Sequence, residues 1–184
     1  MDALWSPLLL WWVLAAVLLF WSVGAYNRLV RLRAKVLSIF ASLAAQFERY
    51  AAWMAQHAPT PLADAEPPPV GDVWTNLRAA TAQFTASLAA ARSSPLDTEA
   101  LAALAAGRSV LLMAWQYVGD ATLAQSRGDE GPAAIRAEWE AITTHTQSAE
   151  KAFAGAVDAY NRAVRQFPAV LLAWLFGFKP VRSL

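Results

Sequence analysis

The stretch AYNRLVRLRAKVLSIFASLAAQFERYAAWM, residues 25–54, has a continuous apolar pattern that is typical of a long packed helix. Its large apolar residues recur at steps of three and four: Leu29, Leu32, Val36, Phe40, Leu43, Phe47, Tyr50 and Met54. This spacing places them on one face of an α-helix and predicts that the face is buried against other helices. After Pro7 the next proline is Pro59, so we expect one long helix that ends near His57.

Upstream of this stretch the chain is strongly apolar. No residue from Ala3 to Asn27 is charged, and residues 8–23 read LLLWWVLAAVLLFWSV. The hydrocarbon core of a bilayer requires about 20 such residues in a helix, so residues 1–27 are predicted to be a transmembrane anchor. A cleaved signal peptide is the alternative, because Val23-Gly24-Ala25 offers small residues for cleavage after Ala25. Against it, the N-terminus carries Asp2 and no Lys or Arg, and the apolar run is long for a signal peptide.

Basic residues flank only one side of the predicted anchor. They are Arg28, Arg31, Arg33 and Lys35. The positive-inside rule then places the N-terminus outside and the rest of the chain in the cytoplasm.

Three further helices are expected after His57. Residues 58–71, APTPLADAEPPPVG, are predicted to be an extended connector. A second helix follows Asp72. Within SSPLDTE at residues 93–99, Ser94 is expected to cap a third helix whose first residue is Pro95. The third helix should end near Gln125, and a fourth should run from about Pro132 to about Phe167.

These segments predict an all-α protein. Alanine is abundant, glycine is scarce (8 residues), and no stretch shows strand alternation. The economical arrangement is a transmembrane helix that continues into an antiparallel up-down four-helix bundle over residues 28–167, followed by a tail at residues 168–184.

Two nearly identical heptapeptides fit this topology: AYNRLVR at residues 25–31 and AYNRAVR at residues 159–165. An up-down bundle returns the fourth helix to the membrane beside the first, so both heptapeptides should lie at the membrane end. Tyr26 and Tyr160 are then interfacial anchors, and Asn27 and Asn161 hydrogen-bond between the two helices. The alternative, which the sequence supports equally, is that the two tyrosines belong to the core and the two asparagines cap helices or face solvent.

The charge distribution agrees with the same topology. The segments around the two heptapeptides and the tail contain eight basic residues and no acidic residue: Arg28, Arg31, Arg33, Lys35, Arg162, Arg165, Lys179 and Arg182. Anionic lipid headgroups would attract such residues by about 1 kcal/mol each near the surface. These residues, with Trp174, are the predicted membrane-interface site.

The tail contains an apolar run that is too short to span a bilayer. In FPAVLLAWLFGFKP, residues 167–180, the run from Ala169 to Phe178 is about half the required length. Two interpretations stay open. Either the tail lies in the membrane interface, with Trp174 at the headgroups and Lys179 and Arg182 beside them, or it folds back over the membrane end of the bundle.

The sequence offers little for catalysis or metal binding. It has no cysteine, no Gly-rich phosphate loop and no hydrolase motif. No Glu lies three residues before His57 or His145, as a di-metal bundle site would require. We therefore predict no enzyme activity and no catalytic, cofactor-binding or metal-binding residue. A net charge of +1 gives no reason to expect a nucleic acid partner.

The two ends of the chain resemble the LemA family. The resemblance rests on the N-terminal anchor, YNRLVRLRAKV at residues 26–36, and AYNRAVRQFPAVLLAWLFGFKP at residues 159–180. The middle departs from the family pattern: Phe153-Ala154 stands where a further Tyr-Asn is expected, and WQYVGD replaces the usual acidic motif of the third helix.

The resemblance implies a single-pass protein of the bacterial inner membrane, with a helical bundle and no established enzymatic role. We expect a scaffold or adaptor whose partners are the bilayer, anionic lipid headgroups and an unidentified protein. Self-association into a homo-oligomer is compatible with this expectation. A periplasmic or secreted binding protein, released after Ala25, is the alternative.

Overall fold

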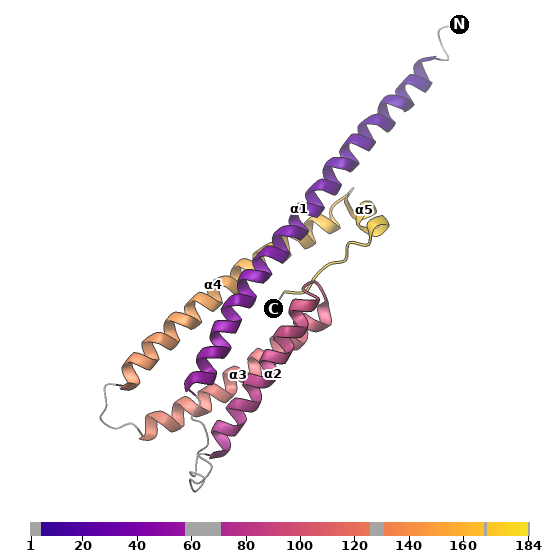
Figure 1. Ribbon diagram of the computed structural model, residues 1–184. Helices are drawn as coiled ribbons and strands as arrows, with labels where there is room; N and C mark the ends of the chain where they lie inside the picture. Colours follow the sequence, from indigo (N-terminus) through magenta and orange to yellow (C-terminus); the bar gives the residue numbers. More distant parts are fainter. Residues whose placement is uncertain (1–4, 58–70, 126–130, 168, 184) are drawn as a thin grey trace.

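The computed structural model describes residues 5–57, 71–125, 131–167 and 169–183, and these form helices without any strand (Figure 1). The helices are α1 (Trp5–His57), α2 (Gly71–Ser93), α3 (Thr98–Gln125), α4 (Gly131–Arg165) and α5 (Ala169–Phe176). The predicted all-α class is confirmed, and α1 ends at His57 as its apolar pattern predicts. The connector expected at residues 58–71 lies, apart from Gly71, outside the described residues.

Helices α1 and α4 lie side by side and run in opposite directions (Figure 1). Three ring pairs mark their register: Trp21–Phe167 with centroids 6.0 Å apart just beyond the end of α4, Phe40–Phe153 at 5.6 Å, and Tyr50–Trp139 at 5.2 Å. Residue numbers rise along α1 as they fall along α4. The N-terminal part of α1, before Trp21, extends past this partner as a continuation of the same helix (Figure 1).

Helices α2 and α3 form a close hairpin that packs against α1. Gly107 permits the close approach, because a Cβ there would lie 2.9 Å from the Ser87 hydroxyl oxygen and 3.5 Å from the Phe84 Cα. The Phe84 ring also meets the Phe47 ring of α1 edge to face, with centroids 5.4 Å apart. The hairpin and the α1–α4 pair therefore share one hydrophobic core.

The core contains the face that the sequence predicts for α1. Of that set Leu32 is half-buried, and the others are buried: Leu29, Val36, Phe40, Leu43, Phe47, Tyr50 and Met54. Near the C-terminal end of α1, three tryptophan rings from three helices meet with centroids 5.0 to 5.2 Å apart: Trp53, Trp115 and Trp139. Such aromatic contacts contribute about 0.5–1.5 kcal/mol per pair beyond area burial.

The start of α3 differs from the prediction. The helix begins at Thr98, not at Pro95, and residues 94–97 form a turn closed by a 3.0 Å bond from the Asp97 amide to the Ser94 carbonyl. The Asp97 carboxylate accepts a hydrogen bond from the Glu99 amide at 3.3 Å, so Asp97 is the N-cap in place of Ser94. Both residues are capping types, and the turn around Pro95 decides between them.

Candidate membrane-facing site

The site lies where α1 passes α5, and we call this part of the molecule the α5 end (Figure 1). Helix α5, within the tail, was not expected as a separate element. Gly177 ends it with φ +70°, a conformation that glycine adopts without strain. The Phe178 amide then donates to the Ala173 carbonyl at 2.8 Å, which closes a Schellman motif and turns the chain back toward α4.

The second heptapeptide holds the returning tail. The Asn161 amide nitrogen donates to the Val181 carbonyl at 2.7 Å, and the Val181 amide donates to the Asn161 side-chain oxygen at 2.9 Å. The Tyr160 hydroxyl donates to the Lys179 carbonyl at 3.2 Å. Val181 is also buried in the core. The hydrogen bonds of Asn161 thus go to the tail, where the sequence analysis considered bonds between helices.

The first heptapeptide contacts the same tail through its tyrosine. The Tyr26 ring lies 4.9 Å from the Phe176 ring and 6.1 Å from the Phe178 ring, measured between centroids. Tyr26 is partly exposed and Asn27 is exposed, whereas Tyr160 is buried. Tyr26 of the first heptapeptide and Tyr160 and Asn161 of the second therefore contact the same tail.

Helix α5 buries a face of small residues and exposes a face of large apolar residues. Ala169 and Ala173 are buried against the helices. Most of its large apolar side chains are exposed, with Trp174 at 85 % and Phe167, just before the helix, at 75 %; the others are Val170, Leu171, Leu175 and Phe176, whereas Leu172 is half-buried. The same end carries the apolar part of α1, whose large residues from Leu9 to Val23 are all exposed. Exposed apolar areas of this extent mark surfaces that contact lipid or another protein.

Among the residues that the structure describes, two helices contain stretches that are long and apolar enough to cross a membrane. One belongs to α1 and begins near Leu9, and none of its most apolar window is buried. The other is Thr98–Val118 in α3, where 28 % of the most apolar window is buried; this stretch was not expected to be a membrane span. Its exposed residues include Val110, Met113 and Tyr117.

The eight predicted basic residues are all exposed and follow the two heptapeptides and the tail. Arg28 lines a cavity beside Gln166 and Phe167, so residues near both heptapeptides meet there. Arg162 and Arg165 line an open depression with Asp158 and Asn161. Burial raises the pKa of the Tyr160 hydroxyl, and the nearby Arg33 guanidinium opposes this shift. The antiparallel pairing of α1 and α4 thus brings the basic segments to the α5 end.

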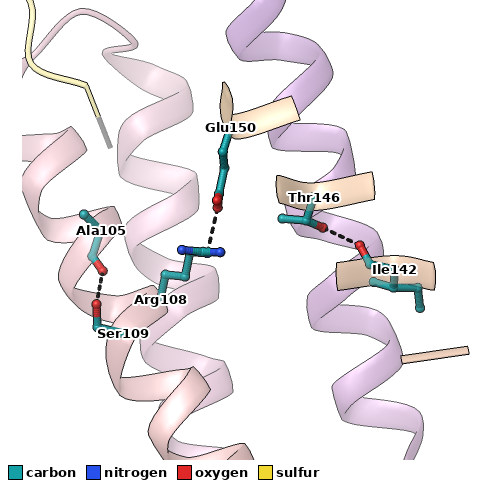
Figure 2. Close-up of polar contacts among 6 residues, drawn as sticks. All are labelled: Ala105, Arg108, Ser109, Ile142, Thr146 and Glu150. Atoms are coloured by element: carbon teal, nitrogen blue, oxygen red, sulfur yellow. Dashed lines mark hydrogen bonds and ion pairs between the residues drawn. The ribbon is translucent and has the colours of Figure 1, made fainter. Parts of the chain in front are cut away.

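A polar contact that the sequence analysis missed joins α3 to α4. Arg108 Nε lies 2.7 Å from Glu150 Oε1 (Figure 2), and both side chains are half-buried. They line a cavity of about 150 Å³ with Phe47 and Ser109. Burial raises the pKa of the Glu150 carboxyl, and Arg108 opposes the shift. Burial likewise raises the pKa of the nearby Tyr50 hydroxyl.

The ion pair links two helices, and two hydroxyls beside it are engaged within their own helices, whereas the buried Tyr50 hydroxyl has no hydrogen-bond partner among the described residues. Ser109 donates to the Ala105 carbonyl at 3.0 Å, and Thr146 donates to the Ile142 carbonyl at 2.9 Å (Figure 2). Within the described residues, no cluster of three His, Asp or Glu side chains could hold a metal ion.

Comparisons with known proteins add no assignment: no family model, no curated protein and no solved structure matches this chain.

Proposed function

We propose that this chain is a membrane-anchored, non-enzymatic scaffold or adaptor of the LemA type. The N-terminal part of α1 crosses the bacterial inner membrane, and α1 to α4 form an antiparallel up-down four-helix bundle on the cytoplasmic side. The observation that carries the proposal is the coincidence, at the α5 end, of the exposed apolar part of α1, the exposed face of α5 and the basic residues.

The order of these features along α1 matches the layers of a bilayer. The exposed apolar segment up to Val23 suits the hydrocarbon core, and Arg28, one turn beyond Gly24, suits the headgroup layer. Helix α5 packs at the same level through Tyr26 and presents Trp174 outward. The bundle and its basic residues then follow on the cytoplasmic side.

Several contacts favour an uncleaved anchor over a cleaved signal peptide. Trp21 contacts Phe167, and Ala25 packs against the core. Cleavage after Ala25 would remove both residues and interrupt a continuous helix. The released, periplasmic or secreted binding protein is therefore the second candidate.

The intact mass of the protein extracted from membranes tests the anchor. We expect the mass of the full chain, and we expect the protein to resist extraction at alkaline pH. The mass of a chain that begins at Tyr26 would contradict the proposal and favour the released form.

Paired arginine substitutions identify the spanning helix. Leu14→Arg with Leu18→Arg should release the protein from the membrane, because an arginine at the bilayer centre costs about 2.5–3.5 kcal/mol. Val110→Arg with Met113→Arg is the matched control, since these residues are exposed on α3. Release by the α3 pair alone would show that α3 is the membrane segment. Crosslinking in intact membranes would then identify the protein partner.

A further inference from the structure

A cavity of about 310 Å³ lies between α1 and the junction of α4 with α5. This volume is at the lower end of the range for small-molecule sites. Phe20, Trp21 and Gly24 of α1 form one wall, and Phe167 forms part of the other. Arg28 and Gln166 are the polar side chains of the lining.

The lining changes from apolar to cationic along α1. From Phe20 to Arg28 the helix rises about 12 Å, so the aromatic wall and the guanidinium lie at opposite ends. A soluble anion would leave the aromatic wall in contact with water, and a purely apolar molecule would leave Arg28 without a partner charge. The lining is complementary to an amphiphile with a negatively charged head.

The position of the cavity selects the kind of amphiphile. Its apolar end continues into the exposed, uncharged segment of α1, along which an acyl chain can extend. A volume of about 310 Å³ equals about ten water-sized groups, too few for a whole phospholipid. It accommodates the phosphate, the glycerol and the first carbons of one chain.

We propose that this cavity binds one anionic phospholipid, with its phosphate on Arg28 and one acyl chain along the apolar part of α1; the proposal rests on the membrane anchoring argued above. Gln166 donates to the ester or phosphate oxygens, and the Phe167 ring covers the chain. This is a defined site for a single lipid, distinct from the general attraction of the other exposed basic residues to headgroups.

Two pairs of variants isolate the site. A side chain at Gly24 would enter the cavity without a clash, because a Cβ there has no neighbour within 4 Å. Gly24→Leu therefore fills the site, and Gly155→Leu, at an equally open position on α4, is its control. Arg28→Gln removes the cavity cation, and Arg31→Gln removes one charge from the same exposed basic segment outside the cavity.

The measurement is native mass spectrometry of the full chain released from vesicles of equal dioleoyl phosphatidylglycerol and dioleoyl phosphatidylcholine. We expect one retained phosphatidylglycerol on the wild type and on both controls. Gly24→Leu and Arg28→Gln should each lower its occupancy by about tenfold or more, with thermal unfolding as the folding check.

Several results would overturn the site. Equal retention of phosphatidylglycerol and phosphatidylcholine would be one, and unchanged phosphatidylglycerol retention in Gly24→Leu another. An equal loss of phosphatidylglycerol in Arg28→Gln and Arg31→Gln would be a third. The fourth would be a wild-type dimer that Gly24→Leu disrupts, since a second copy of the chain would then occupy the cavity. If any of these results is obtained while the wild type and the variants stay in the membrane at alkaline pH, the lipid site alone is wrong. If the wild type is not embedded at all, both proposals fail.

Discussion

Asn161 and Val181 are joined by two hydrogen bonds of opposite sense, 2.7 and 2.9 Å long, across twenty residues of chain. The amide side chain thereby pairs with both backbone groups of one tail residue, as a neighbouring strand would. Val181 is buried behind this pair. The tail is thus fastened to α4, while α5 presents its large apolar residues outward.

Loss of the Asn161 amide should free the tail. Each hydrogen bond contributes about 0.5–1.5 kcal/mol, so Asn161→Ala should weaken tail attachment by about 1–3 kcal/mol. Tryptic cleavage after Arg182 and exchange of the Val181 amide should both accelerate. Asn27→Ala, at the equivalent and exposed position of the first heptapeptide, is the control and should change neither. Unchanged exchange in Asn161→Ala would show that burial of Val181 holds the tail without the amide.

Helices α1 and α4 should crosslink in a fixed register. Leu29 and Val164 each lie eleven residues, about three turns, from the tilted ring pair Phe40–Phe153, and both are buried. Because the chain has no cysteine, Leu29→Cys with Val164→Cys should crosslink efficiently with a short reagent. Leu29→Cys with Val118→Cys of α3 is the control. More efficient crosslinking in this control would contradict the observed pairing.

Glu150 should make stability depend on pH. Its pKa is higher in the folded chain than in the unfolded chain, so the folded state binds more protons between the two values. The stabilisation is present below the unfolded value and is lost as the pH rises through the folded value. The unfolding temperature of Glu150→Gln, relative to that of the wild type at the same pH, should therefore rise as the pH increases from 4 to 7.

The exposed Glu140 of the same helix provides the control for this comparison, through Glu140→Gln. A difference between Glu150→Gln and the wild type that is constant with pH, or that falls as the pH rises, would show that Arg108 dominates burial at this carboxyl.

Reporter fusions should show the direction of insertion. The basic residues that follow the apolar segment predict a cytoplasmic C-terminus. A fluorescent protein fused after Leu184 should fluoresce, and alkaline phosphatase fused there should be inactive. An active phosphatase would place the four long helices outside the cytoplasm.

Much of the helical organisation follows from local sequence patterns. The apolar face of α1 repeats every three or four residues, so burial of Phe40 and Phe47 could be predicted without knowing their partners. The apolar face of α4 could be predicted in the same way, as burial of Phe153 and Tyr160 shows.

The contacts that depend on register between distant segments could not be predicted. The Arg108–Glu150 pair requires the relative shift of α3 and α4, which no local pattern specifies. The bonds from Asn161 to Val181 require α5 and the turn at Gly177, and α5 is too short to produce a clear periodic signal. The two heptapeptides lie at the same end of the molecule, as predicted, but their tyrosines and Asn161 contact a third segment.

Spin labels at three exposed positions test whether α1 and α5 define one membrane interface. In the cysteine-free chain, nitroxides can be attached singly at Leu19→Cys, Trp174→Cys and Tyr117→Cys, whose native side chains are 69 %, 85 % and 70 % exposed. Collision rates with oxygen and with a water-soluble nickel complex then report depth in reconstituted vesicles. We predict that the label at 19 lies in the hydrocarbon, the label at 174 at shallow depth near the headgroups, and the label at 117 in water. A label at 174 that is as accessible to nickel as the label at 117 would show that α5 does not lie at the membrane interface.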